Sequence, residues 1–192
     1  MVDQAAASGA HALKLQTYTA DTITMNSRNE SFRISDPDSL WHGKYLYDLY
    51  QDAHTPWHWH EAIFKRAAQR GMQAFSSPFD VSAVDFLETL DVPAYKIASF
   101  ENSHVPLLQK VAATGKPVII STGASTLAEI ATAVGVLIDA GCKTLWCLNA
   151  PARIRHLRSI PTFKPYRTCV RPLVVLSGCP IIRWVSVRRW LQ

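Results

Sequence analysis

The sequence predicts an α/β fold built on a parallel sheet. Apolar runs with strand character are centred near residues 74, 97 and 119, and short helical patterns lie between them. Such alternation is typical of parallel strands joined by right-handed crossovers. A doubly wound sheet and a (β/α)8 barrel both satisfy it. No glycine-rich dinucleotide-binding motif follows any of the strands.

Length and composition are those of one globular domain. The chain has 192 residues, of which 48% are hydrophobic and 18% charged. We find no signal peptide and no apolar run long enough to span a bilayer. The four cysteines form neither a CxxC pair nor a zinc-ligand spacing. We therefore expect a reduced, cytoplasmic setting and no membrane partner.

The amino-terminal part carries one strand and one long excursion. Residues 5–10 have the pattern of a helix end, and residues 11–17 that of a strand with Lys14 in its middle. Residues 18–54 form a polar and aromatic excursion that contains a predicted helix over residues 40–50. Excursions of this length between elements are usually functional or flexible.

Regular strand–helix units follow the excursion. Thr55 is predicted as an N-cap with Pro56 at the first helical position, and Asp80 is predicted to cap a later helix. The other helix boundaries are predicted from apolar residues at helical spacing and from the glycines that follow the helices. The predicted helices cover residues 55–70, 82–90, 105–114 and 127–140, and the predicted strands cover residues 72–76, 95–99 and 117–121.

Three histidines, His54, His58 and His60, cluster at the start of the helix over 55–70. One interpretation is a metal site. The other is a first helical turn that packs with Trp57 and Trp59. We favour the second, because no carboxylate or further ligand has diagnostic spacing.

Polar side chains gather where the predicted strands end. They are Lys14, Gln16, Ser76, Ser77, Lys96, Ser99, Glu101, Ser121 and Thr122. A (β/α)8 barrel carries its chemistry at this rim. Two lysines and several hydroxyls there predict an anion site for phosphate or carboxylate. Burying Lys96 is costly unless an anion meets it, and the alternative is a strand whose lysine reaches the surface.

The net charge of +5 belongs to the end of the chain. Residues 1–144 hold 11 basic and 15 acidic residues, a net charge of −4, whereas residues 145–192 hold 9 basic residues and no acid. Basic segments occur in nucleic-acid-binding proteins, so a non-enzymatic basic binding module is one hypothesis. This segment is also rich in Trp, Pro, Cys and Val, unlike a solvated polycationic arm.

Five segments resemble the sialic-acid-type synthase family and occur in the same order. They are KLQTYTADT (14–22), LYDLYQDAHTPWHWH (46–60), FSSPFD (75–80), PAYKIASFE (93–101) and PVIISTG (117–123). KLQTYT and TPWHWH are most similar to the pseudaminic branch. The resemblance implies that residues 1–144 form a partial (β/α)8 TIM barrel, followed by an irregular tail over residues 145–192.

The resemblance also implies a reaction. Enzymes of this family condense phosphoenolpyruvate with an amino-hexose to a nine-carbon 2-keto acid and release phosphate. In the pseudaminic branch the sugar is a 2,4-diacetamido-2,4,6-trideoxy hexose, and the alternative is N-acetylmannosamine. A divalent cation, Mn²⁺ or Mg²⁺, polarises the sugar aldehyde as a Lewis acid. The expected partners are these small molecules and a second subunit of a homodimer, with no nucleic acid.

Site residues follow from the same resemblance. The positions that bind phosphoenolpyruvate are Lys14, Ser77, Lys96, Ser99 and Ser121. Gln16 and Glu101 match sugar-contacting positions. Lys96 and Glu101 are the predicted catalytic residues, and Glu101 is suited to proton transfer. At position 58, where the family often has Glu, this chain has His, which weakens the metal interpretation of the histidine cluster.

The chain also departs from the family. We expect it to lack the family's first strand, its metal-ligand histidines and its small carboxy-terminal domain. Codons for residues 146–155, read from the third base, can encode VLECTSAYP, and those for residues 176–190 can encode VGLSDHTLGIGASV, which resemble the missing motifs. We therefore interpret the tail as a frameshifted sequence. An incomplete barrel exposes strand edges and apolar surface, so we expect this chain to be poorly stable and inactive alone.

Overall fold

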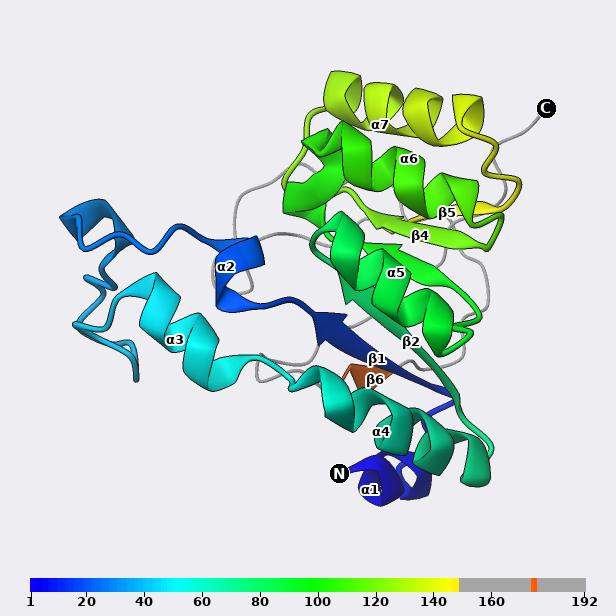
Figure 1. Ribbon diagram of the computed structural model, residues 1–192, viewed down its shortest axis with the longest axis horizontal. Coiled ribbons are helices and arrows are strands. Elements are labelled where there is room, and N and C mark those ends of the chain that lie inside the picture. The colour runs from blue at the N-terminus through cyan, green and yellow to red at the C-terminus, as the bar shows by residue number, and fades with distance from the viewer. Residues whose placement is uncertain (149–173, 176–192) are drawn as a thin grey trace, which may run out of the picture.

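A single parallel sheet organises the chain. The computed structural model describes residues 1–148 and 174–175 (Figure 1). The strands lie in the order β5-β4-β3-β2-β1-β6, and every neighbouring pair is parallel. Their bounds are β1 Ala12–Thr17, β2 Gln73–Pro78, β3 Tyr95–Ile97, β4 Val118–Ser121, β5 Leu145–Leu148 and β6 Val174–Val175.

Helices cover one face of this sheet. The α-helices are α1 Val2–Ala7, α2 Ala20–Ile23, α3 Leu46–Ala53, α4 Trp57–Gln69, α5 Val81–Thr89, α6 Val105–Ala113 and α7 Leu127–Asp139, and the 3-10 helices are η1 Glu30–Phe32 and η2 Ser99–Ser103. Figure 1 shows α4, α5, α6 and α7 in a row along the sheet, with α3 set apart from them. The strands alternate with these helices along the chain, as the sequence predicts.

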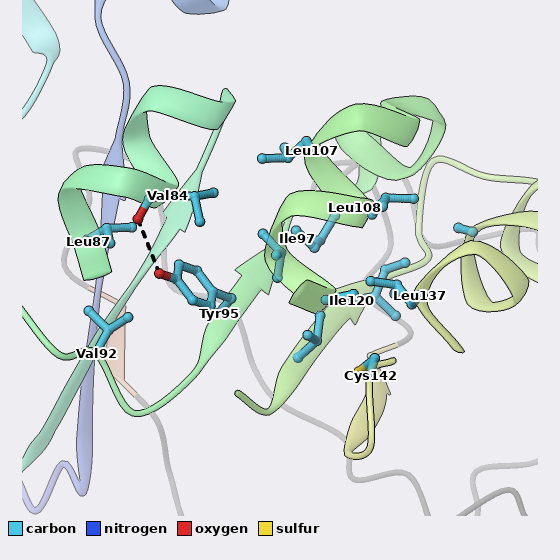
Figure 2. Packing of buried hydrophobic residues seen from close by; sticks show 14 residues of the cluster. Val84, Leu87, Val92, Tyr95, Ile97, Leu107, Leu108, Ile120, Leu137 and Cys142 are labelled. Carbon is cyan, nitrogen blue, oxygen red and sulfur yellow. Dashed lines mark hydrogen bonds between the residues drawn. The ribbon is translucent and has the colours of Figure 1, made fainter. Parts of the chain in front are cut away.

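The main core lies between β3 and β4 and the helices α5, α6 and α7 (Figure 2). Tyr95 and Ile97 from β3 and Ile120 from β4 are fully buried there. They pack against helix residues that include Val84, Leu87, Leu107, Leu108 and Leu137. Burying one such aliphatic side chain contributes roughly 1.5–3 kcal/mol, so this face supplies most of the apolar stabilisation.

Two predicted boundaries of helices are wrong. The residue that caps α4 is Pro56 rather than Thr55, and no side chain caps it. The helix expected over residues 40–50 begins only at Leu46. Gly43 has a φ of +83°, which a continuous helix does not allow, and its N–H donates to the carbonyl of Ile34. Asp80 caps α5 as predicted, because its carboxylate accepts the backbone N–H of Ser82.

The sheet continues into the segment predicted to be an aberrant tail. Leu145 to Leu148 form β5 and pair in register with Val118 to Ser121 of β4. Val174 and Val175 pair with Leu13 and Lys14 at the other edge. The rest of residues 145–192 lies outside the described residues, so the domain division at 144 and the frameshift interpretation stay predictions. Within the described ranges, no helix has the length and apolar character needed to cross a membrane.

Candidate functional site

Polar residues of four strands share the sheet face that the described helices do not cover, which we call the open face. Leu13 and Leu15 of β1 pack under α1 and α4, so the alternation of the strand directs Lys14 and Gln16 to the opposite face. Gln16 pairs with Ser77 of β2, and paired residues of parallel strands project to the same side. Because Ile97 and Ile120 face the helices, Lys96 and Ser121 join this polar face.

The two lysines of this face are buried. Lys14 is 8% exposed and Lys96 is 6% exposed. Burial lowers the pKa of Lys14 to about 8. Burial, and then the positive charge of Lys14, lower the pKa of Lys96 to about 7, while Glu101 partly opposes the change. Two buried ammonium groups whose charged forms are disfavoured, one of them also by the charge of the other, indicate a site that can receive an anion.

Lys96 is held at the end of its strand by two acceptors. Its Nζ donates to the carbonyl of Ile97 at 2.7 Å and to the hydroxyl of Ser121. Among residues 1–148, no carboxylate forms an ion pair with Lys14 or Lys96. The part of the chain that the structure describes therefore gives neither lysine an ion-pair partner, and Glu101 only partly offsets the lowering of the Lys96 pKa.

Ser99 and Glu101 lie on the turn η2, directly after β3, and not on the strand. The predicted strand over 95–99 is two residues too long, because η2 begins at Ser99. Glu101 is half-buried, and burial raises the pKa of its carboxyl, against the lowering effects of its own backbone N–H and of Lys96. Its buried Oε2 has no hydrogen-bond partner within the described residues. A carboxyl with a raised pKa retains its proton at higher pH, which suits a proton donor.

Asn102 is a residue of this site that the sequence interpretation missed. It is 4% exposed, and its Nδ2 donates to the carbonyl of Ser121 at 2.7 Å and to the hydroxyl of Ser125 at 2.9 Å. The Ser125 hydroxyl lies 3.4 Å from the carbonyl of Ser99, to which it donates. No sequence pattern distinguishes Asn102 from an exposed asparagine, so sequence analysis had no basis for including it.

A second polar group was also missed, and it lies on the helix-covered side of the strands. The Nε2 of His60 is 2.9 Å from the hydroxyl of Thr17, which is 2.7 Å from the hydroxyl of Ser76. The Nδ1 of His60 is 3.3 Å from the carbonyl of Pro56. A neutral imidazole that donates from Nδ1 and accepts at Nε2 satisfies both contacts, and burial lowers the pKa of His60. The group joins α4 to β1 and β2.

The histidine cluster does not converge on one point. His60 is fully buried in the group just described, His58 is exposed, and the Nδ1 of His54 lies 2.8 Å from the carbonyl of Gln51. Trp57 stacks on Phe86 and donates its indole N–H to the carbonyl of Tyr18 at 3.3 Å. The expected packing is thus found for Trp57, whereas Trp59 is 54% exposed.

The residues of the described site do not fit a divalent cation by themselves. Within residues 1–148 and 174–175, no three His, Cys, Asp or Glu side chains lie close enough to ligate one ion. Glu101 supplies a carboxylate, but its neighbours on the open face are lysines and serines. Serine and lysine are poor ligands for such a cation, so the cation expected from the family has no binding set in this part of the chain.

The sequence matches one family of known proteins. The model of the NeuB family matches residues 1–158. The chain is 44% identical over 129 residues to the pseudaminic acid synthase of Helicobacter pylori, covering 67% of this chain and 37% of that protein. It is 46% identical over 123 residues to the pseudaminic acid synthase of Campylobacter jejuni, covering 64% and 35%. The chain therefore spans between 35% and 37% of the length of these relatives.

Solved structures share the fold. A sialic acid synthetase from Leptospira borgpetersenii superposes with a TM-score of 0.68 at 24% identity, over 82% of this chain and 50% of that one. The spore coat polysaccharide biosynthesis protein SpsE of Bacillus subtilis superposes with a TM-score of 0.60 at 26% identity, over 79% and 38%. The predicted α/β fold, a partial (β/α)8 barrel, is confirmed.

Proposed function

The chain belongs to the NeuB family, and from this premise we propose that its open sheet face binds phosphoenolpyruvate for condensation with an amino-hexose. The reaction is a carbon–carbon bond-forming transfer. The similarity to two pseudaminic acid synthases supports a 2,4-diacetamido-2,4,6-trideoxy hexose as the acceptor. The product is then a nine-carbon 2-keto sugar acid.

The observation that carries the proposal is the buried lysine pair. Phosphoenolpyruvate carries a phosphate and a carboxylate, and each needs a cation when it leaves water. Lys14 and Lys96 are buried on one face, and the pKa of Lys96 is lowered further by the charge of Lys14. A bound anion between them stabilises both charged forms, so the cost of burying the lysines is offset when ligand is present.

The remaining residues of the open face supply hydrogen bonds and one proton. We assign Ser77 and Ser121 of the open face and Ser99 of the turn η2 to phosphoenolpyruvate, and Gln16 to the sugar, on the basis of the family resemblance. C3 of phosphoenolpyruvate attacks the open-chain aldehyde, water adds at C2, and the C–O bond breaks to release phosphate. We assign to Glu101, whose pKa is raised, the transfer of a proton to the oxygen of the former aldehyde.

The whole reaction needs more than the described residues provide. We propose that the 192-residue chain binds phosphoenolpyruvate but does not complete turnover alone, because it spans about 37% of its relatives and offers no cation ligand set in the described part. A family-type homodimer likewise stays a prediction.

Isothermal titration calorimetry with phosphoenolpyruvate at pH 7 tests the binding. We expect saturable binding by the chain, weakened at least about tenfold in Lys96→Met, because a hydrogen-bonded charge contact of about 1.5–3 kcal/mol is lost. The matched control is Lys44→Met, since Lys44 is an exposed lysine paired with Asp52 at 2.9 Å. Equal binding by the chain and Lys96→Met would exclude this face as the site.

A phosphate-release assay with phosphoenolpyruvate and the diacetamido hexose tests turnover. We expect release at background. Release above background that disappears in Lys96→Met would show that the chain is an active enzyme and that the expectation of inactivity is wrong.

A further inference from the structure

We propose that Asn102 is a positioning residue that fixes the Ser99–Glu101 turn against the end of β4. The proposal rests on the proposed function, because it assigns a role at the same site. Asn102 itself faces Ser121 and Ser125, and it acts on a ligand only through the residues that it holds.

One amide connects three segments that approach from different parts of the chain. Nδ2 of Asn102, in η2, donates to the backbone of Ser121 at the end of β4 and to the side chain of Ser125 in the loop before α7. Ser125 then donates back to the carbonyl of Ser99. The closed circuit keeps Ser99 and Ser121, two predicted phosphoenolpyruvate contacts, at a fixed separation.

The same circuit reaches the lysine. Lys96 donates to the hydroxyl of Ser121, and the carbonyl of Ser121 accepts from Asn102. Glu101 is the residue before Asn102 in η2, so its carboxyl moves with that turn. A change at Asn102 should therefore displace both the Ser121 hydroxyl and the Lys96 ammonium.

Stability alone does not account for an asparagine here. The orientation of the amide is fixed, because only its nitrogen can donate to the Ser121 carbonyl. Its Oδ1 is then left buried with no hydrogen-bond partner among the described residues. An unpaired buried acceptor costs about 1–3 kcal/mol, which offsets the gain from the two donated bonds. The amide instead fixes the position of the turn η2 relative to Ser121 and Ser125.

Hydrogen–deuterium exchange tests, without any ligand, whether the hydrogen bonds of Asn102 hold the turn η2 in place. Asn102→Leu keeps a similar side-chain size and removes both N–H donors, and Ser125→Ala is a milder change that removes one partner. We expect the amides of η2 to exchange several-fold faster in both variants, while those of α4 are unchanged. The control is Asn26→Leu, at an exposed asparagine. Unchanged exchange in η2 in both variants would overturn the proposal.

A double-mutant cycle on phosphoenolpyruvate affinity tests the consequence. Loss of about 1.4 kcal/mol of positioning corresponds to about tenfold weaker binding in Asn102→Leu. In a Ser99→Ala background the same change should weaken binding by less than in the unchanged chain, because one of the residues that Asn102 positions no longer offers a hydroxyl. An equal loss in both backgrounds indicates general destabilisation and overturns the positioning role. If the unchanged chain binds no phosphoenolpyruvate, the proposed function fails. Hydrogen exchange then still decides whether Asn102 holds the turn η2 in place.

Discussion

The two faces of the sheet differ in what they do for the protein. The helix-covered face carries Tyr95, Ile97 and Ile120 in an apolar core, whereas the open face carries Lys96 and Ser121. Lys96 and Ile97 are neighbours in one three-residue strand. Ile97 therefore packs in the apolar core, whereas its neighbour Lys96 projects to the open face, because successive side chains of a strand point to opposite faces.

Under the proposed function, this contrast separates the stabilising face from the ligand-binding face. Burial on the helix side stabilises the fold, and burial on the open side lowers the pKa of two lysines and so acts against it. A protein retains such a cost at a place where a ligand offsets it. Substitutions on the two faces should consequently change different measurements.

The largest effect is expected from Ile97→Ala. Ile97 is fully buried between the helices and the sheet, and a truncation of this kind costs about 2–5 kcal/mol. Urea unfolding followed by tryptophan fluorescence measures the loss. A loss below about 1 kcal/mol would contradict the assignment of the helix side as the stabilising face.

Thr17→Val should have the next largest effect. The change keeps the shape of Thr17 but leaves Nε2 of His60 and the hydroxyl of Ser76 without a partner, which costs about 1–3 kcal/mol. The control is Thr132→Val, because the hydroxyl of Thr132 is exposed and bonds only within α7. If both variants unfold alike, the buried group contributes nothing specific to the fold.

Lys96→Met should have the opposite sign from Ile97→Ala. Removing an ammonium whose pKa is lowered by burial relieves a cost, so the free energy of unfolding at pH 7 should stay level or rise. The same urea titration compares the two neighbours directly. A loss as large as that of Ile97→Ala would mean that Lys96 is structural.

The two buried lysines should also make stability and affinity depend on pH. The pKa values of Lys14 and Lys96 are about 8 and about 7 in the folded chain, below the usual value of 10.5. The unfolded chain then binds more protons between about pH 7 and pH 10, so the free energy of unfolding should rise with pH over that window. Affinity for phosphoenolpyruvate should fall at least about tenfold from pH 7 to pH 9 as the lysines lose charge. Calorimetry at both pH values checks this, and a flat affinity would exclude the lysines as the anion contacts.

Much of the architecture was predictable because it is encoded locally. The alternation of strand and helix patterns predicted the parallel sheet, and Asp80 predicted the start of α5. The alternation within β1 and β3 already places Lys14 and Lys96 opposite the apolar residues beside them. The motifs that resembled the synthase family were likewise sufficient, since the family match confirms them.

The sequence by itself thus determined the fold class, the family and the strand residues of the open face. The tertiary structure alone decided how polar groups pair. Thr17 meets His60 and Ser76 across 43 and 59 residues of sequence, and Asn102 meets Ser121 across 19. Local patterns follow the periodicity of one helix or strand, whereas these hydrogen bonds depend on how separate elements pack, which no single segment encodes.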